Sequence, residues 1–528
     1  MENRQYIGAR YVPRFTGEYD TTTAYEALDV VDNGQGTSYI AKKPTPPNTP
    51  LTNTEYWFMY GSTSGAIINL QDQINNINSE LGNIIGEDET LSTSKTISGN
   101  NYSLNDSTIT GNSSGNYVVD NGSLKNVVYN TSAEIGLTVK NKASIKENEI
   151  NNTGSQGVSV NQLSGKVLIT DNDIESRSYP ILINENASGS GAIIDGNFLK
   201  SRTGDAIELN NPNGTFKDIA VSNNILDAGS DGGTGHASGF AIGIAKGKNI
   251  AVSGNVSKYS RQEGLHLENE GKHIVVDGNV FDQCQTDGAW IQQKYNKEFS
   301  QNGDVVIHSN NRYAGNGSGS GILVVYDTDA DDSIVYDKGN IYSDFGIGIK
   351  NRGSNGRAKH RVFDDVILNC DMGVQTNQDV YGHIVMDNVD ECVNVLGTSN
   401  RVIIDDVNII HAPAYNKIVT FEDTGHQSRA YLKHISIEKD VSGVTSDDIL
   451  PIPLYAKGQL ILRAYNPYRT MRVYEIDGTT LTQLYSDGIG TVIVSPSFTS
   501  SALNVSFGSN NYTGLYKLEF TGVYIIGS

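Results

Sequence analysis

The stretch Ile145-Lys146-Glu147-Asn148-Glu149-Ile150 contains the phrase that decides the fold: an apolar residue, two spacers, Asn, one spacer and a second apolar residue. The phrase returns, in some copies more loosely, around Asn172, Asn197, Asn224, Asn255, Asn279 and Asn310. Successive asparagines are 24, 25, 27, 31, 24 and 31 residues apart. Such a period is too short for a domain and fits one coil of a solenoid. The sequence therefore predicts a stack of coils.

A second phrase, Gly-apolar-x-apolar or close to it, follows most of these asparagines, as in Gly157-Val158-x-Val160 and Gly264-Leu265-x-Leu267. Alternation over so few residues predicts short strands with one buried face, and the Gly and Asn residues between them mark tight turns. Two or three short strands in every coil give a parallel β-helix. An asparagine at a fixed place in each coil would stack on the next as an amide ladder, so we assign these asparagines to structure rather than catalysis.

Over residues 92–446 this pattern resembles the right-handed β-helix of the pectate-lyase type. The handedness is implied by the resemblance and by the general right-handed crossover rule. Residues 447–528 lack the coil phrase, and their alternating apolar residues predict antiparallel strands in a C-terminal β-sandwich-like domain. The fold class predicted for the chain is therefore all-β.

Residues 1–61 differ from the coils, because they are richer in proline and contain two strand-like segments, 28–31 and 38–41, around a Gly-containing turn. This pattern resembles the N-terminal module of tail proteins from phages that infect Gram-positive bacteria, and more loosely small chitin-binding-type modules. The resemblance implies virion attachment or carbohydrate binding. Tyr39 and Trp57 would then stack on sugars, or else form the core of so small a module.

Apolar residues follow one another at spacings of 3, 4, 3, 4 and 3 from Ile67 to Ile84, which is a heptad seam of a and d positions. Isoleucine at both positions favours trimers or tetramers over dimers. We predict a trimeric coiled-coil neck over residues 62–91. The alternative is an amphipathic helix that caps the end of the solenoid.

The order of module, neck, β-helix and terminal β-domain resembles that of bacteriophage tail spikes, which are receptor-binding proteins. The resemblance implies a homotrimer on the virion tail, made in the host cytoplasm and acting extracellularly at the host surface. Its implied partners are a phage tail or baseplate protein, met through the N-terminal module, and a host cell-surface glycan. The C-terminal domain would serve folding, trimer registration or sugar binding.

Composition narrows the partners further. The chain carries 39 basic and 60 acidic residues, a net charge of −21, which argues against nucleic acid or an anionic membrane surface. No run of about 18 apolar residues predicts a membrane span. The N-terminus lacks the apolar region of a signal peptide, so ordinary secretion is not expected. Cys284, Cys370 and Cys392 match no zinc motif and are expected to be free, packed thiols.

Residues at matching places in consecutive coils become neighbours about 4.8 Å apart. Aligning the second phrase gives three adjacent columns. The first contains Asp205, Phe240, Glu263 and Asp287; the second Glu208, Gly243, His266, Trp290 and Leu323; the third Asn210, Ala245, Glu268, Gln292 and Val325. Acids, a histidine and a tryptophan thus converge on two coils. Longer loops after Asn224 and at 293–304 point to the same place, where solenoids put binding surfaces.

Glycoside hydrolysis needs two carboxyl groups, about 5 Å apart for a retaining outcome and about 6.5–9.5 Å for an inverting one. Glu263 and Asp287, one rung apart, approach the first spacing and are the predicted catalytic pair. Two carboxyl groups this close have different pKa values, so one stays protonated as the acid while the other is ionised as the base. Further predicted catalytic residues are Glu208, Glu268 and His266. Predicted substrate-binding residues are Trp290, Gln292, Asp205, Lys350, Arg352 and Tyr326. Alternatively, the acids form turns and His266 bonds a neighbouring coil.

Asp327 and Asp329 begin an acidic segment whose oxygens are spaced to hold a structural calcium ion, but the glycine and terminal Glu of an EF-hand loop are missing. A solvated loop is therefore expected, with no other cofactor.

Three functions stay open. The first is a depolymerase that hydrolyses a capsular polysaccharide, exopolysaccharide or wall teichoic acid. The second is a non-enzymatic receptor-binding protein for the same glycan, and the third is a polysaccharide lyase, for which only Lys350 and Arg352 approach the acids as neutralising cations.

Overall fold

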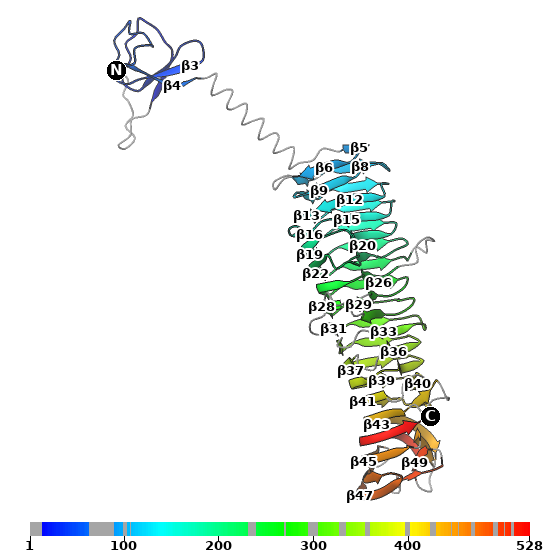
Figure 1. Ribbon diagram of the computed structural model, residues 1–528. Helices are drawn as coiled ribbons and strands as arrows, with labels where there is room; N and C mark the ends of the chain where they lie inside the picture. Colours follow the sequence, from blue (N-terminus) through cyan, green and yellow to red (C-terminus); the bar gives the residue numbers. More distant parts are fainter. Residues whose placement is uncertain are drawn as a thin grey trace. The chain divides into compact units, whose positions relative to one another are not determined.

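The computed structural model describes residues 13–62, 89–98, 103–105, 107–230, 239–268, 271–293, 305–326, 334–353, 359–396, 402–422, 429–444, 446–451, 453–465, 470–488, 495–500, 502–507 and 512–527. The chain divides into two compact units, Met1–Ile85 and Gly86–Ser528 (Figure 1). Each unit is described by itself below. Among the described residues, no helix has the length and apolar character needed to cross a bilayer.

The first unit is a four-stranded sheet of β1 (Arg14–Glu18), β2 (Asp29–Asp32), β3 (Thr37–Ala41) and β4 (Trp57–Ser62). Its small core is aromatic. Trp57 is 2% exposed and meets Tyr19 and Tyr25 at ring-centroid distances of 5.8 and 5.3 Å. Tyr39 is partly buried against the same cluster. Of the two alternatives for Trp57, the structure shows the core and not a sugar-stacking surface, because a module this small needs its largest apolar side chain as a core.

The predicted coiled-coil neck, with its Ile67–Ile84 seam, lies outside the described residues except at its ends. Its last three residues form β5 (Glu89–Leu91), which pairs in parallel with β8 (Thr108–Gly111). The described β-helix strands therefore begin three residues before the predicted start at residue 92.

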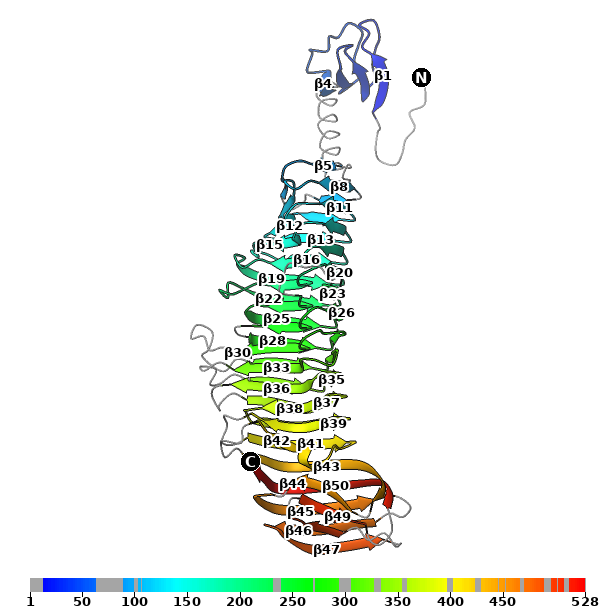
Figure 2. The same ribbon diagram turned by 90° about the vertical axis from the view of Figure 1, so that its right-hand side faces the viewer.

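The second unit is built on two long parallel sheets, whose strands stack coil upon coil (Figure 2). Each coil contributes one strand to a fourteen-stranded sheet. Its strands are β6 (Lys95–Ser98), β9 (Tyr117–Asp120), β12 (Ile135–Lys140), β15 (Gln156–Val160), β18 (Tyr179–Ile183), β21 (Ile207–Leu209), β24 (Ile242–Ile244), β27 (Leu265–Leu267), β30 (Ala289–Gln293), β33 (Ser320–Tyr326), β36 (Ile347–Gly353), β38 (Met372–Thr376), β40 (Glu391–Val395) and β42 (Val419–Phe421). The parallel β-helix predicted from the coil period is confirmed.

The larger sheet receives two short strands from most coils. These pairs include β13 (Ala143–Lys146) with β14 (Glu149–Asn152), β16 (Val167–Thr170) with β17 (Asp173–Ser176), β19 (Gly189–Asp195) with β20 (Phe198–Ser201), β22 (Phe216–Ser222) with β23 (Ile225–Ala228), β25 (Gly247–Ser253) with β26 (Val256–Ser260), β28 (Gly271–Asp277) with β29 (Val280–Phe281), β31 (Val305–Ser309) with β32 (Arg312–Ala314), and β34 (Ile334–Lys338) with β35 (Ile341–Ser343). Later coils contribute the single strands β37 (Lys359–Leu368), β39 (Val380–Asp387) and β41 (Val402–Ile410). Ladders of Ile, Leu and Val fill the interior between the sheets.

The asparagine ladder exists and is continuous. Its members are Asn148, Asn172, Asn197, Asn224, Asn255, Asn279, Asn311 and Asn340. Each Nδ2 donates to Oδ1 of the next member at 2.8–3.0 Å. The residue before each member has a left-handed backbone, which turns the corner between the two strands. The predicted member Asn310 is wrong by one residue: it is the left-handed residue (φ 54°), and Asn311 enters the ladder.

Parallel pairing ends at β43 (Arg429–Val444), which pairs in parallel with β41 and antiparallel with β50 (Tyr512–Gly527). Antiparallel strands β45 (Tyr455–Ala464), β46 (Thr470–Asp477) and β47 (Thr480–Gly488) continue the same sheet. A three-stranded sheet of β44 (Ser446–Pro451), β49 (Ala502–Ser506) and β48 (Ser495–Phe498) lies in the same unit. The change of pairing falls near the predicted boundary at 446, and the C-terminal strands share one hydrophobic core with the β-helix.

Candidate functional site

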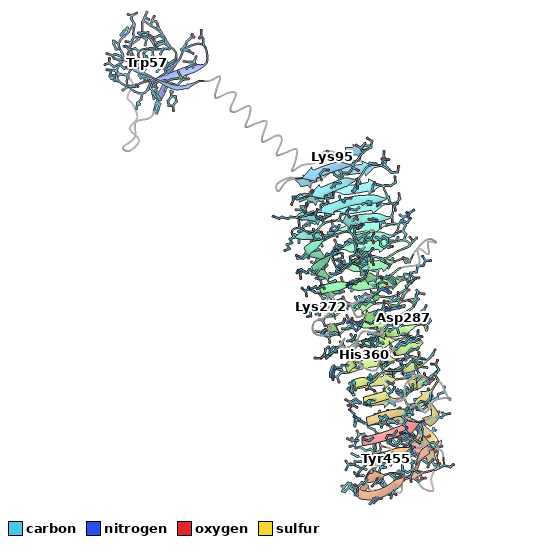
Figure 3. All side chains as sticks on the ribbon, in the orientation of Figure 1. Trp57, Lys95, Lys272, Asp287, His360 and Tyr455 are labelled. Carbon is cyan, nitrogen blue, oxygen red and sulfur yellow. The ribbon has the colours of Figure 1, made fainter. Side chains whose placement is uncertain are left out.

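The fourteen-stranded sheet carries the predicted columns. Strand register puts Glu208, Gly243, His266, Trp290, Leu323 and Lys350 opposite one another in successive coils. Three residues earlier in the first four of these coils are Asp205, Phe240, Glu263 and Asp287. Glu263 and Asp287 therefore lie on adjacent rungs, which are about 4.8 Å apart. Figure 3 labels Asp287 on the β-helix.

His266 is the centre of an aromatic stack on this face. Its ring lies parallel to Phe240, with centroids 4.1 Å apart and planes 7° apart, and is 5.3 Å from the ring of Trp290. Its Nδ1 is 3.7 Å from Glu263 Oε2, and its Nε2 is 3.6 Å from Glu268 Oε2. Burial lowers the pKa of His266, but the two carboxylates outweigh burial and raise it to about 9. The raised pKa favours the imidazolium form of the ring at neutral pH.

Glu208 occupies space that Gly243 leaves open. A Cβ atom on residue 243 would lie 2.0 Å from Glu208 Oε2, so any side chain there would displace this carboxyl group. Burial, followed by the charge of the neighbouring Asp205, raises the pKa of Glu208 well above its usual range, although His266 opposes the shift. Asp205 is itself buried, and its Oδ1 accepts a hydrogen bond from the backbone N–H of Phe240 at 2.8 Å. Its environment thus favours the neutral acid form of Glu208.

Asp287 is fixed by the next coil, where the backbone N–H of Ser320 donates to its Oδ1 at 2.5 Å. Burial is the main cause that raises the pKa of Asp287, and the charge of Glu263 adds to it. The hydrogen bonds from Ser320 and the charge of Lys350 oppose the shift. Asp287 therefore favours its acid form more than an exposed aspartate does.

A groove of about 540 Å³ begins at Asp287 and runs along the later coils. Its charged lining residues are Asp287, Lys350, Asp371 and Glu391, and the rest of the lining is Gly319, Ser320, Leu323, Gly346, Ile347 and Met372. Sequence reasoning missed Asp371 and Glu391. The register Ser320–Ile347–Met372–Glu391 places Glu391 in the same column as Asp287, so extending the alignment past residue 325 would have found it.

Other predicted site residues are distributed as follows. Gln292 pairs with Val325, and Arg352 follows Val325 in the next coil, so both lie beside the central column. Tyr326 is 2% exposed and belongs to the interior, which makes its prediction as a substrate-binding residue wrong. Asp205 is buried and neighbours Glu208.

The remaining predictions concern metals and thiols. Asp327 and Asp329 lie outside the described residues. Within the part of the chain that the structure describes, no group of three or more His, Cys, Asp or Glu side chains is arranged to hold a metal ion. Cys284, Cys370 and Cys392 are free and buried, which confirms that they are packed thiols.

Comparison of the fold with solved structures gives similarities to phage tail spikes. The Dettilon tailspike protein gp208 is 10% identical, with coverage of 87% of this chain and 90% of the other and a TM-score of 0.39. A mutant tailspike of the E. coli bacteriophage HK620, in complex with a hexasaccharide, is 10% identical over 86% of this chain and 89% of the other, with a TM-score of 0.38. Tailspike gp49 of the Acinetobacter baumannii bacteriophage Fri1, a capsular polysaccharide depolymerase, is 11% identical over 74% and 81%, with a TM-score of 0.22.

No family model and no curated protein sequence matches the chain. At about 10% identity and TM-scores below 0.5, the structural similarities carry no statement about activity or substrate. What this site does is therefore argued from its own side chains.

Proposed function

We propose that this chain is a bacteriophage tail spike that binds a host cell-surface glycan and hydrolyses it on the face around Glu263 and Asp287. One observation carries the hydrolysis: two carboxyl groups on adjacent rungs have opposite environments. Burial favours the acid form of Asp287, whereas Glu263 faces the imidazolium of His266, which is a counter-charge for a carboxylate. A proton donor beside a carboxylate is the arrangement that glycoside hydrolysis requires.

In this mechanism Asp287 protonates the glycosidic oxygen while Glu263 attacks the anomeric carbon, and the bond to the leaving sugar breaks. Water then cleaves the glycosyl–enzyme ester, and Asp287, now a carboxylate, removes the proton of that water. Side chains that run parallel from adjacent rungs would hold their carboxyl groups about 4.8 Å apart, near the separation of about 5 Å that goes with a retaining outcome. The rings of Phe240, His266 and Trp290 lie beside this pair and supply aromatic surface for a neighbouring sugar ring.

The order of the parts supports the assignment to a virion tail. A small N-terminal unit precedes the β-helix, and the sequence between them has the heptad spacing of a trimeric neck. We assign attachment to a tail or baseplate protein to the first unit. We assign trimer formation to the neck and to the β-helix.

Binding without cleavage is the second candidate. The side chain of Glu263 is only 6% exposed, which limits the access of an anomeric carbon to its oxygens. The aromatic stack needs no chemistry to hold a sugar. A non-enzymatic receptor-binding protein would use the same face in this way.

The decisive assay incubates the full-length protein with purified capsular polysaccharides, exopolysaccharides and wall teichoic acids, and measures reducing ends, 4,5-unsaturated products and released phosphate. New reducing ends that are lost in Glu263→Gln and Asp287→Asn support hydrolysis at this site. Glu134→Gln, on an exposed glutamate in another coil, is the matched control. Unsaturated products would instead indicate a lyase, and retained binding with no product of any kind would leave only receptor binding.

A further inference from the structure

The groove beside Asp287 continues the candidate site along the column direction, so a glycan bound at Glu263 and Asp287 would place its next sugar units there. It is formed where Gly319 and Gly346 line the surface without side chains. Its remaining lining combines a lysine, three acids and an apolar patch, and each of these limits what the groove can accept.

Lys350 is the cation of the groove. Burial lowers its pKa, and the charge of Arg352 lowers it further, while Asp287 and Glu422 offset this only in part. Its ammonium group is thus partly removed from water without full compensation by the protein. Such a group gains most from an oxygen acceptor supplied by a ligand.

The acids decide the charge of that ligand. Asp371 and Glu391 line the same groove beside Asp287, so a phosphate or carboxylate on the ligand would face two further acidic side chains for one lysine. The Glu391 carboxylate is held in place, because its Oε1 accepts hydrogen bonds from Asn394 Nδ2 at 3.0 Å and from Thr420 Oγ1. Fixed acceptors of this kind suit O–H and N–H donors of a neutral ligand.

The apolar part of the groove lining indicates that the ligand carries an apolar group. Leu323, Ile347 and Met372 line the groove together with the charged groups. A plain hexose offers hydroxyl groups and has no methyl group to place on three aliphatic side chains. Burying one methyl group there contributes about 0.8 kcal/mol.

We infer that the groove binds a neutral 2-acetamido sugar unit, with Lys350 donating to its amide carbonyl, a groove carboxylate accepting from its N–H, and its methyl group packed on Leu323, Ile347 and Met372. The inference rests on the proposed function and narrows it, because it selects a neutral acetamido-sugar glycan and excludes an anionic polymer such as a teichoic acid.

The test uses the full-length Glu263→Gln protein, which keeps every groove residue while removing the proposed nucleophile. Saturation-transfer NMR is measured with the methyl glycosides of N-acetylglucosamine and N-acetylgalactosamine, and with those of glucose, galactose, glucosamine and glycerol phosphate. We expect the acetyl methyl protons of at least one acetamido sugar to receive the strongest saturation. We also expect a Kd at least fivefold lower than for the matching plain hexose.

Adding Lys350→Met, which keeps the aliphatic stem, should raise that Kd at least fivefold, and Met372→Ser should weaken the acetyl methyl signal. Lys146→Met, on an exposed lysine of the other sheet, is the matched control and should change neither. Equal affinity for plain hexoses, tighter binding of glucosamine or glycerol phosphate, or no binding of any probe would overturn the inference. Hydrolysis by the wild-type protein of a glycan without acetamido groups would overturn it too, yet leave the proposed function intact.

Discussion

Asp365 ends the asparagine ladder with a carboxyl group in place of an amide. Its Oδ1 accepts from the backbone N–H of Asn340 at 2.8 Å, as a ladder asparagine would, but its Oδ2 is buried without a hydrogen-bond partner. Within the ladder each Nδ2 also donates to an earlier carbonyl, as Asn340 does to His308 O at 2.9 Å. The acceptor is the carbonyl three residues before the previous ladder member, as His308 is before Asn311. For residue 365 the previous member is Asn340, so the corresponding acceptor is the carbonyl of Asp337. Burial, together with the charge of Asp337, raises the pKa of Asp365 well above its usual range.

Asp365→Asn should therefore stabilise the β-helix. The new Nδ2 supplies the missing donor, and an unpaired buried polar atom costs about 1–3 kcal/mol, so we expect a gain of about 1–2 kcal/mol in urea unfolding at pH 7. Because the folded-state pKa is raised, the wild-type deficit disappears as the pH falls towards the unfolded value of about 4, and the two proteins should converge there. Asp171→Asn, at an exposed corner, is the control, and lower stability of Asp365→Asn at pH 7 would contradict the explanation.

His266 offers a direct test of the site electrostatics. With a pKa of about 9 it should stay protonated at neutral pH, and NMR of its ring should show a titration midpoint well above the usual 6.5. Its contribution to stability is complete below about pH 6.5 and is lost as the pH rises through about 9. Glu268→Gln removes one of its two carboxylates and should lower the midpoint, whereas Glu134→Gln should not. A neutral ring at pH 7 in the wild type would refute the proposed counter-charge for Glu263.

Three neighbouring strands of the larger sheet meet around a buried charge. Asp337 on β34 has Oδ1 2.8 Å from His308 Nδ1 on β31 and Oδ2 2.6 Å from His360 Nε2 on β37, and all three side chains are fully buried. Burial would raise the pKa of Asp337, but the two histidines overcome it and lower the pKa to about 2. Figure 3 labels His360 among the later coils. The three strands are thus joined by buried hydrogen bonds between imidazole rings and a carboxylate, where other coils use aliphatic ladders.

Asp337→Asn should destabilise this part of the β-helix by about 1–3 kcal/mol at pH 7, because an amide group has only one oxygen and cannot accept hydrogen bonds from both buried imidazoles in the way the two carboxylate oxygens do. A carboxylate with a depressed pKa stabilises above its unfolded value, so the difference from wild type should shrink as the pH falls from about 4 to about 2. Urea unfolding at several pH values measures this. Asp364→Asn breaks an exposed Asp–His pair of 2.8 Å, to His383, and should change stability by less than about 0.5 kcal/mol. Equal effects of the two substitutions would contradict the role of burial.

The coil period predicted the strands and turns well, but it did not predict which of two adjacent residues faces the interior. Adjacent asparagines at 310 and 311 fit the spacing equally, and only the left-handed corner residue decides which one turns inward. Strict alternation along β33 already places Tyr326 on the inward side with Ile322 and Val324, so its assignment to the surface ignored a rule that the sequence contains.

The columns of the site were predictable because each coil keeps a constant offset to the next. The environments of the acids were not, since they depend on side-chain conformation and burial. The columns place Glu208 beside Gly243, but the sequence gives no sign that burial raises the pKa values of Glu208 and Asp287. The groove depends on Asp371 and Glu391, which belong to coils beyond the aligned phrases.

Across the whole molecule, the last prediction concerns how copies of the chain associate. Phe198, Ile225, Val256 and Val280 face outward on successive rungs of the larger sheet and are 37–41% exposed. A neighbouring copy would remove this column from water, as expected if the Ile67–Ile84 seam forms trimers. Light scattering should then give three times the chain mass of 57.1 kDa. Ile225→Ser with Val256→Ser should weaken the trimer on dilution, whereas Phe15→Ser, on an exposed residue of the first unit, should not. A single-chain mass for the wild type would refute the trimer.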